Sequence, residues 1–251
     1  MAKRHRLDVL MVDRGLAATR ERARSLILAG RTLVDGYVIT KAGSQVSTSA
    51  ELDLSEPDHP YVGRGGIKLA HALKNFEVAV SGRIAIDIGA SIGGFTDALL
   101  QYGAAHVIAV DVGYGQLDWQ LRNNPRVLVI ERFNARHLTT DDLPSAFQQV
   151  DIVTIDVSFI SVKKILPVIP SLLNPDADVI VLVKPQFEAG RAEVGKGGIV
   201  RDPVVHAKTV NEVVAFADRI GLHYTAGVPS PITGSRGNRE FLVHLRSGVN
   251  S

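Results

Sequence analysis

The chain of 251 residues has no cysteine, one tryptophan and two methionines, and aromatic residues make up only 6% of it. Without cysteine it cannot form a disulfide framework, a thiolate-bound zinc or iron–sulfur site, or a cysteine nucleophile. The absence also fits a reducing cytoplasm, which is where we expect the protein. The eight histidines show no metal-ligand spacing, so we expect no metal site.

Long hydrophobic runs are also lacking. The longest, such as 179–183, have the length of a strand, far below the roughly 20 apolar residues with which a helix crosses a bilayer. The first residues are basic, but charged residues follow them instead of an apolar stretch, so we expect no secretory signal. We therefore predict a protein without a membrane partner.

Charge is unevenly distributed in an otherwise ordinary globular composition, with 45% hydrophobic and 22% charged residues. The formal net charge is +2, but residues 1–48 hold nine Lys or Arg and four acidic residues, a net charge of +5. The remainder of the chain therefore carries −3. A basic segment beside a mildly acidic body points to a polyanionic partner, and the length fits one large and one small domain.

The basic segment predicts a small α+β domain. Apolar residues recur at helical spacing before Gly15, and a second helical pattern covers 19–30. Residues 32–38 predict two strands joined by a tight Asp-Gly turn, and 51–54 alternates like an edge strand. Prolines and a Gly-Arg-Gly-Gly run between 47 and 66 then indicate a boundary near 57–65. We predict a small domain over 1–60, a linker over 61–66 and a large domain over 67–251.

Three stretches of this segment, Arg6–Asp8, Thr19–Arg24 and Ala29–Gly36, resemble the S4-type (αL) RNA-binding domain. The resemblance implies a helix pair that rests on structured RNA through backbone phosphates, for which the planar fork of arginine is suited. Such a module reads shape and phosphate position more than base identity. From charge alone, a solvated helix face would be the better interpretation. The residues that we predict to bind RNA are Arg4, Arg6, Arg20, Arg22, Arg24, Arg31 and Arg64.

From residue 83 onward, apolar strands alternate with helical stretches. The predicted strands cover 83–87, 106–111, 127–130, 151–156, 179–184, 223–229 and 241–245. The predicted helices between them cover 95–102, 160–173 and 203–220. This alternation predicts an α/β fold with a Rossmann-like parallel sheet and helices on both faces. No convincing helix separates the last two strands, so we expect them to pair antiparallel.

A glycine-rich turn, Asp87-Ile88-Gly89-Ala90-Ser91-Ile92-Gly93-Gly94-Phe95, follows the first of these strands. Its glycines allow the backbone to approach a ligand closely, although such a turn often only makes a sharp corner. Asp111 ends the next strand, at about the spacing at which an acid meets a ribose. A carboxylate at the mouth of the turn repels phosphate and suits a cationic amino-acid end, which favours S-adenosylmethionine over NAD. The sequence has no Gly-x-x-x-x-Gly-Lys-Ser/Thr motif, which argues against a P-loop NTPase.

Charged residues end four of the predicted strands at one edge of the sheet, where open α/β sheets bind ligands. These residues are Asp87, Asp111, Asp156 and Lys184. One of them alone could simply mark the exit of a strand to solvent, but four together favour a site. The residues that we predict to bind the cofactor are Asp87, Gly89, Ser91, Gly93, Gly94, Phe95, Asp111 and Asn134. For Asn134 the alternative is a turn cap.

With Lys68 in Gly-Gly-Ile-Lys-Leu and Glu240 in Asn-Arg-Glu-Phe, the large domain resembles the FtsJ-like ribose 2′-O-methyltransferases. The whole chain resembles the TlyA-type, or hemolysin-A-like, rRNA methyltransferases, to which the sequences 111–117 and 195–200 are specific. The resemblance implies S-adenosylmethionine as the cofactor, cytidine in 16S and/or 23S rRNA as the substrate, and ribosomal subunits as partners. The catalytic residues that it implies are Lys68, Asp156, Lys184 and Glu240.

The chemistry explains these residue types, because a ribose hydroxyl must lose its proton as it attacks a methyl group. Lys184 is the predicted base and must be neutral part of the time, while Asp156 would orient it. Lys68 and Glu240 would position the hydroxyl. General acid–base help of this kind contributes about 10²–10⁴-fold.

Two other functions are open. One is a non-catalytic factor that binds RNA during ribosome assembly and keeps a cofactor pocket, against which the complete set of four catalytic residues argues. The other is a haemolysin, for which the sequence shows no insertion helix. Ser158 suggests a hydrolase by its type alone, but no Gly-x-Ser-x-Gly turn surrounds it. Tyr114 and Trp119 could line a pocket, but we expect them to fill the core.

Overall fold

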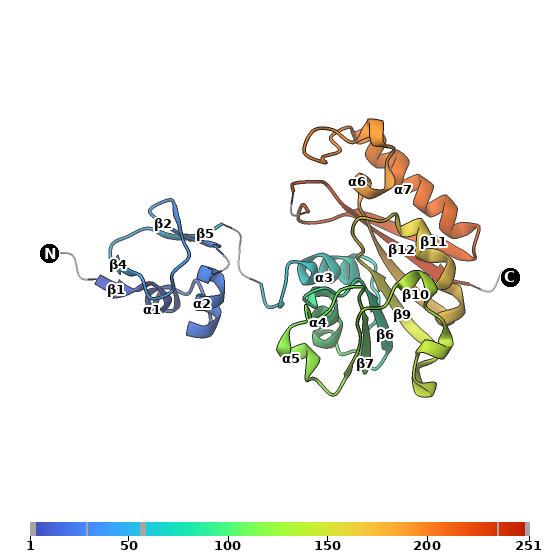
Figure 1. Cartoon of the computed structure of the whole chain (residues 1–251), viewed down its shortest axis with the longest axis horizontal. Helices are drawn as coiled ribbons and strands as arrows, with labels where there is room; N and C mark the ends of the chain where they lie inside the picture. The colour runs from blue at the N-terminus through green and yellow to red at the C-terminus, as the bar shows by residue number, and fades with distance from the viewer. Residues whose placement is uncertain (1–3, 29, 56–58, 235, 249–251) are drawn as a thin grey trace. The chain divides into compact units, whose positions relative to one another are not determined.

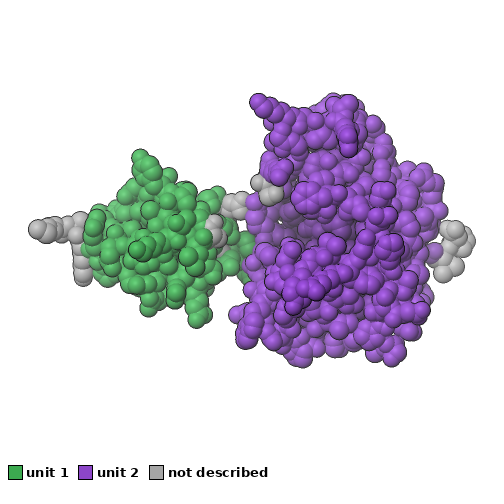
Figure 2. All heavy atoms as spheres, in the orientation of Figure 1, with its two compact units in different colours: residues 1–60 green, residues 61–251 purple. Residues whose placement is uncertain are grey.

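The computed structural model describes residues 4–28, 30–55, 59–234 and 236–248. The chain forms two compact units, Met1–Pro60 and Tyr61–Ser251 (Figure 2). We call them unit 1 and unit 2. Residues 61–66, predicted as the linker, belong to unit 2, and helix α3 (Gly65–Asn75) begins among them. Residues 57 and 58 of the predicted boundary lie outside the described ranges. Among the described helices, none is long and apolar enough to cross a membrane.

Unit 1 is an α+β domain, as its sequence predicts. Its elements are β1 (Arg4–Arg6), α1 (Leu7–Asp13), α2 (Arg20–Leu28), β2 (Thr32–Val34), β3 (Tyr37–Ile39), β4 (Gln45–Ser47) and β5 (Leu52–Leu54). Strands β3, β2 and β5 form an antiparallel sheet, which confirms the predicted hairpin and edge strand. Asp35 and Gly36 both have positive φ in the turn from β2 to β3, as a tight Asp-Gly turn requires. The basic strand β1, which the sequence does not predict, pairs antiparallel with β4.

The core of unit 1 holds its two short helices together. Leu7, Met11 and Ile27 have no exposed surface and belong to one buried cluster. Isolated helices of this length are marginal in water, so the packing of their apolar faces supplies most of their stability. The charged side chains of α1 and α2 are thereby left to the outer surface of the helix pair, with the exception of Asp8, which is buried.

The described part of unit 2 contains a sheet of seven strands in the order β11-β12-β10-β9-β6-β7-β8 (Figure 1). These strands are β6 (Ile84–Ile88), β7 (His106–Val110), β8 (Val127–Ile130), β9 (Val150–Ile155), β10 (Leu173–Val183), β11 (Leu222–Pro229) and β12 (Phe241–Ser247). The further helices are α4 (Gly94–Gln101), α5 (Trp119–Arg122), α6 (Pro185–Glu188) and α7 (Pro203–Asp218). Strands β6 to β10 are parallel to one another, whereas β12 is antiparallel to both β10 and β11. The predicted fold class and the antiparallel pairing of the last two strands are confirmed.

Helices cover both faces of this sheet because alternate residues of a strand point to opposite sides. In β10, Val179, Val181 and Val183 belong to one buried cluster, and Ile180 and Leu182 belong to the other. Helices α3, α4 and α5 pack on the face of Ile180 and Leu182, and α7 packs on the opposite face (Figure 1). Strands that are buried on both faces are apolar throughout, which is why these segments are visible in the sequence.

The predicted helix over 160–173 is wrong. The chain there makes three short 3₁₀ turns, η4 (Val162–Lys164), η5 (Leu166–Val168) and η6 (Pro170–Leu172). Pro167 and Pro170 lack the backbone N–H that a continuous α-helix needs, and both lie in the first turn of a 3₁₀ segment. The apolar residues still face the core, so their spacing indicates burial but not helix type. The other 3₁₀ turns are η1 (Ala135–His137), η2 (Thr140–Asp142), η3 (Ser145–Phe147) and η7 (Arg191–Glu193).

The strand order changes direction between β6 and β9. From β6 the chain moves outward through β7 to β8, and it then returns to the other side of β6 with β9 and β10. In open α/β sheets, ligands bind at such a switch point, outside the carboxyl ends of the strands. The loops that follow β6 and β9 are therefore where the fold favours a site.

Candidate active site

Two cavities open at the carboxyl ends of the parallel strands. The lysine cavity has a volume of about 420 Å³ and is lined by Lys68, Lys184 and Glu240, among others. The glycine-loop cavity has a volume of about 490 Å³, and its wall includes Gly89 and Asp111. The residues that line both cavities are Ser91, Asp156, Ser158 and Phe159. Both volumes are typical of small-molecule sites, so two ligands can meet at the shared wall.

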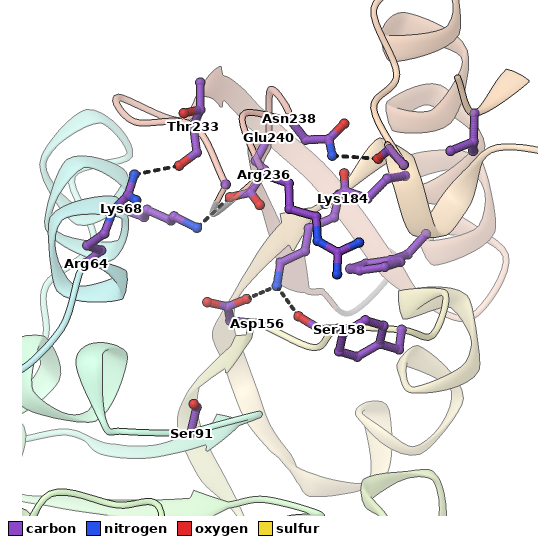
Figure 3. Close-up of a pocket in the computed structure, with 16 residues that line it drawn as sticks. Arg64, Lys68, Ser91, Asp156, Ser158, Lys184, Thr233, Arg236, Asn238 and Glu240 are labelled. Atoms are coloured by element: carbon purple, nitrogen blue, oxygen red, sulfur yellow. Dashed lines mark hydrogen bonds and ion pairs between the residues drawn. The ribbon is translucent and has the colours of Figure 1, made fainter. Parts of the chain in front are cut away.

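The four predicted catalytic residues come together in the lysine cavity, although Lys68 and Glu240 are 172 positions apart in the sequence. Lys68 lies in α3 and Glu240 directly before β12, while Asp156 directly follows β9 and Lys184 directly follows β10. Lys68 Nζ donates a hydrogen bond of 2.5 Å to Glu240 Oε2 (Figure 3). Lys184 Nζ lies 2.5 Å from Asp156 Oδ1. The structure thus groups the four residues as two lysine–carboxylate pairs.

Both pairs are partly withdrawn from water. The side chains of Lys68 and Lys184 are each 10% exposed, that of Glu240 is 3% exposed and that of Asp156 is 20% exposed. A buried charge is tolerated when an opposite charge and hydrogen bonds accompany it. Removal of either carboxylate would leave the charge of its partner lysine unpaired in a place with little water. The lysine and the carboxylate of each pair therefore depend on each other.

Ser158 and Gly234 complete the surroundings of the two pairs. Ser158 Oγ accepts a hydrogen bond of 2.9 Å from Lys184 Nζ (Figure 3). Gly234 lies so close to Glu240 that a Cβ atom on it would be 2.4 Å from Glu240 Oε1. The sequence predicts neither residue for the site, because a serine or a glycine in a loop is too common to mark one.

Asn238 fixes a loop in the wall of the lysine cavity. Its side chain is buried, with Oδ1 accepting from the backbone N–H of Val200 at 2.9 Å and Nδ2 donating to the carbonyl oxygen of Gly198 at 2.8 Å. Gly198 and Val200 both lie in the sequence 195–200, which carries part of the family resemblance. A signal for Asn238 was present in the sequence, because it stands two residues before Glu240 in the same motif.

Four of the predicted cofactor residues, Gly89, Ser91, Asp111 and Asn134, line the glycine-loop cavity. The carboxylate of Asp111 accepts from the backbone N–H groups of Ser91 and Gly113, each at 2.7 Å, and so ties the loop after β6 to the loop after β7. An ionised carboxylate has about four acceptor sites, so Asp111 can still accept from a ligand. Asn134 caps η1 by accepting from the backbone N–H of Arg136, so the turn-cap alternative also applies to it.

The other four predicted cofactor residues, Asp87, Gly93, Gly94 and Phe95, line neither of these two cavities. A Cβ atom on Gly93 would meet the side chain of Leu121, and one on Gly94 would meet the backbone of Gly65. Phe95 is buried with residues of α3 and α4. These residues pack the start of α4 against its neighbours, and in this way they hold the glycine-rich turn in place.

Asp87 lies beneath the turn and has no exposed surface. Its carboxyl group accepts from Thr96 Oγ1 at 2.7 Å and from Thr154 Oγ1 at 3.0 Å. Burial raises the pKa of Asp87 to about 7, although these two donors act in the opposite direction. The residue therefore joins β6, β9 and α4 as an internal polar group.

The raised pKa of Asp87 predicts a specific dependence of stability on pH. The folded protein binds a proton at Asp87 more tightly than the unfolded chain, where the pKa is 3.8. The stability from this group is therefore fully present below about pH 4 and declines as the pH rises to about 7. We expect Asp87→Asn to remove this slope, so that between pH 5 and pH 7 the difference in unfolding free energy from wild type changes by about 2 kcal/mol. Urea denaturation at the two pH values measures it, with the exposed Asp141→Asn variant as the control for the loss of a carboxyl group.

The expectation that Tyr114 and Trp119 fill the core is wrong. Tyr114 is 66% exposed and Trp119 is 75% exposed. The guanidinium carbon of Arg132 lies 4.0 Å from the centre of the Tyr114 ring, in a cation–π contact. Val112 is exposed as well and lines the glycine-loop cavity.

Two of the arginines predicted to bind RNA share one buried carboxylate in unit 1. Arg6 and Arg20 lie 2.8 Å and 3.2 Å from Asp8 Oδ2. The hydrogen bond from Arg6 lowers the pKa of Asp8 to about 2, so the carboxylate stays ionised and holds both side chains. Arg64 belongs to unit 2, where it lines the lysine cavity and donates to the carbonyl oxygen of Thr233 at 2.9 Å.

The remaining predicted arginines of unit 1 differ in how they are held. Arg22 donates to the carbonyl oxygen of His59 at 2.9 Å, and a nitrogen of Arg31 lies 3.4 Å from Nε2 of the same residue. Arg4 and Arg24 are exposed. The predicted set therefore includes arginines that organise the domain as well as arginines that face solvent.

Comparison with known proteins supplies the family. A model of the FtsJ-like methyltransferase family matches residues 61–247, and a model of the S4 domain matches residues 5–52. The chain belongs to the FtsJ-like methyltransferase family. The 16S/23S rRNA (cytidine-2′-O)-methyltransferase TlyA of Mycobacterium tuberculosis is 46% identical to it over 248 residues, which cover 98% of this chain and 91% of the relative. Hemolysin A of Brachyspira hyodysenteriae is 40% identical over 244 residues, covering 96% and 99%.

A solved structure from Streptococcus thermophilus, described as a hemolysin, superposes on this FtsJ-like methyltransferase with a TM-score of 0.77. It is 43% identical and covers 99% of this chain and 90% of its own. These findings confirm the predicted family, the enzyme class, the S4-type domain and the use of S-adenosylmethionine.

The glycine-loop cavity fits that cofactor. Asp111, at the end of β7, has acceptor sites left for ribose hydroxyls, and Gly89 allows the backbone of Asp156 to approach the end of β6 closely at the switch point. Val110, Phe133 and Ile165 contribute apolar walls to the same cavity, against which a purine ring can pack. The carboxylate of Asp156, on the wall that both cavities share, suits the positive charge of a sulfonium.

Proposed function

We propose that this protein transfers a methyl group from S-adenosylmethionine to the ribose 2′-hydroxyl of a cytidine in 16S and/or 23S rRNA, in the cytoplasm. The observation that carries the proposal is the position of the two lysine–carboxylate pairs, in a cavity that shares a wall with the cofactor cavity. Similarity over nearly the whole chain to a relative named for this reaction supports the choice of substrate.

Lys184 is the proposed base. When bound, S-adenosylmethionine supplies a methyl group on a sulfonium, and the sulfur becomes a neutral thioether when it loses this methyl group. The ribose 2′-oxygen forms the new C–O bond, and its proton passes to Lys184 Nζ. The resulting ammonium lies beside the carboxylate of Asp156 at 2.5 Å, which stabilises its charge. Lys184 lines the lysine cavity but not the glycine-loop cavity, so it can meet the ribose without displacing the cofactor.

Lys68 and Glu240 are the proposed positioning pair. The ammonium of Lys68 has three donors, of which one is used on Glu240, so the other two are available to ribose oxygens. Glu240 fixes the direction of the Lys68 side chain and compensates its charge in a nearly buried place. Holding the hydroxyl close to the reacting methyl group adds to the acid–base contribution.

Unit 1 is the proposed RNA anchor. Residues 1–48 carry a net charge of +5, and Arg4 and Arg24 are exposed. Arginine has five N–H donors, so Arg6 can still meet a phosphate after it has spent two donors on Asp8. Phosphate contacts of this kind position a domain on RNA, whereas the choice of nucleotide depends on the site in unit 2.

Gly234 offers a test of the geometry of the positioning pair. In Gly234→Ala, the new Cβ atom would lie 2.4 Å from Glu240 Oε1, so the carboxylate must move away from Lys68. Because the displaced group is the end of a flexible side chain, we expect little loss of thermal stability but a fall in kcat of about tenfold or more. Gly190→Ala is the control and should stay active, because φ is negative there and the nearest atom to a new Cβ would be Glu193 Oε2, at an ordinary contact distance of 3.4 Å. Equal activity of the two variants would contradict the role of Glu240.

The substrate is tested with purified protein and S-adenosylmethionine carrying a labelled methyl group. The acceptors are small subunits, large subunits and free rRNA from cells that lack this protein. We expect label in at least one of them, and little in the same material from cells that contain the protein, because its target is already methylated. Binding of the cofactor without transfer to any of the acceptors would instead favour the non-catalytic assembly factor.

A further inference from the structure

Lys184 is held by two residues that stand two positions apart in the segment after β9, through an ion pair with Asp156 and a hydrogen bond to Ser158. Asp156 Oδ1 lies 2.5 Å from Lys184 Nζ, and Ser158 Oγ lies 2.9 Å from it (Figure 3). The lysine side chain is 10% exposed, so few water molecules compete with these two partners. Ser158 itself lines both cavities, at the place where the cofactor and the ribose meet.

The number of acceptors matters because the base must be neutral when it takes the proton. A neutral amine has two N–H groups and one lone pair in a tetrahedral arrangement. If Ser158 accepts one N–H group and the nearby carboxylate of Asp156 attracts the other, only one direction is left for the lone pair. With Asp156 alone, rotation about the Cε–Nζ bond lets the lone pair and the free N–H exchange places, so the lone pair points at the ribose for only part of the time.

The segment that carries Ser158 is fixed relative to Lys184 by a second contact. Glu188 lies in α6, which begins directly after Lys184. Its carboxylate accepts from Ser161 Oγ at 2.6 Å and from the backbone N–H of Val162 at 2.7 Å. The side chain of Glu188 is only 2% exposed. Ser158 is thus held between the contact to Lys184 and the contacts of Glu188, even though its own surface is exposed.

We propose that Ser158 is a positioning residue of the methyl transfer, whose hydroxyl group directs the lone pair of the base Lys184 toward the ribose 2′-hydroxyl. This inference rests on the proposed function. It gives a role to a serine whose type alone suggested a hydrolase, and it adds a fifth residue to the four that the family resemblance implies.

The test compares Ser158→Ala with Ser158→Thr, which keeps the hydroxyl group. We expect Ser158→Ala to lower kcat about tenfold, a part of the 10²–10⁴-fold that acid–base catalysis typically contributes. KM for rRNA and the affinity for S-adenosylmethionine should change less than about twofold, because binding is left intact. Ser158→Thr should restore most of kcat. Ser171→Ala, which removes an exposed serine hydroxyl elsewhere in unit 2, is the control and should behave as wild type.

The pH profile of kcat separates this role from a loss of packing. Loss of an acceptor makes the ammonium form of Lys184 less favourable, so the acid limb of the profile should move to lower pH in Ser158→Ala while the plateau falls. The other charged groups of the lysine cavity are Asp156, Lys68, Glu240, Arg64 and Arg236, and all of them are unchanged in the variant. A purely structural defect would lower the plateau without moving the limb.

Wild-type kcat and an unmoved acid limb in Ser158→Ala would overturn the inference, and so would a loss of activity that appears only in KM. The proposed function is tested separately by Lys184→Ala in the same assay. If Lys184→Ala is inactive and Ser158→Ala is normal, only the role of Ser158 is wrong. If Lys184→Ala is fully active, the assignment of the base fails and the role of Ser158 fails with it.

A second variant is used if Ser158→Ala has a lowered Tm. Ser158→Cys keeps a weak sulfur acceptor, so we expect it to show an intermediate kcat and an intermediate shift of the acid limb.

Discussion

Lys184→Ala is expected to lower kcat for methyl transfer at least about 100-fold, because the variant has no group that can take the ribose proton. Its affinity for S-adenosylmethionine should remain within about threefold of wild type, since Lys184 does not line the glycine-loop cavity. Lys184→Arg should be similarly inactive, because a guanidinium stays protonated and cannot serve as a base. Transfer of labelled methyl to rRNA measures kcat, and calorimetric titration measures the affinity.

Lys208→Ala is the matched control for the loss of a lysine charge in unit 2. Lys208 forms an ion pair with Glu193, as Lys184 does with Asp156, but its side chain is 51% exposed and lies outside both cavities. We expect wild-type kcat in this variant. Activity of Lys184→Ala within about threefold of Lys208→Ala would mean that another group, or the water around the ribose, removes the proton.

Gly89→Ala is expected to have the second large effect, on cofactor binding. Gly89 has φ of +85°, and a Cβ atom on it would lie 2.4 Å from the carbonyl oxygen of Asp156. The side chain would therefore push apart the ends of β6 and β9, at the switch point where the two cavities share a wall. We expect the affinity for S-adenosylmethionine to fall at least about tenfold, with a clear loss of thermal stability. Titration of the purified variant and its melting curve test both.

Gly82→Ala is the control that distinguishes the close contact between Gly89 and Asp156 from the cost of a side chain at positive φ. Gly82 has φ of +77°, almost the same as Gly89, but a Cβ atom there would meet nothing within 4 Å. The two variants thus share the cost of placing a side chain in the left-handed region, which is about 1–2 kcal/mol. Only Gly89→Ala should lose cofactor affinity. If both variants bind S-adenosylmethionine equally well, the close contact with Asp156 is not needed for the cofactor site.

The sheet could be predicted from the sequence because its strands are buried on both faces and are therefore apolar throughout, as in Val179–Val183. Of the four residues predicted to be catalytic, Asp156 and Lys184 could be found because they directly follow apolar strands, whereas Lys68 and Glu240 were identified only through the family resemblance. The meeting of Lys68 with Glu240 depends on the tertiary fold, and no local pattern contains it.

Other features could not be predicted, for physical reasons. The segment 160–173 has the apolar spacing of a helix, but its prolines break it into 3₁₀ turns. Tyr114 and Trp119 are exposed, whereas hydrophobicity alone places aromatic residues in the core. Asp87 stands at a strand end like Asp111, yet it lies beneath the turn and only Asp111 lines a cavity. The direction in which a side chain faces at a strand end depends on the loop that follows, and the sequence does not reveal it.

In the proposed reaction, the methyl group goes to a ribose 2′-oxygen of cytidine. Digestion of the labelled rRNA from the transfer assay to nucleosides, followed by mass spectrometry, identifies the nucleoside that carries the label. We expect 2′-O-methylcytidine, with no label when Lys184→Ala replaces the wild-type protein. Label in a base-methylated nucleoside, or in the ribose of a nucleoside other than cytidine, would contradict it.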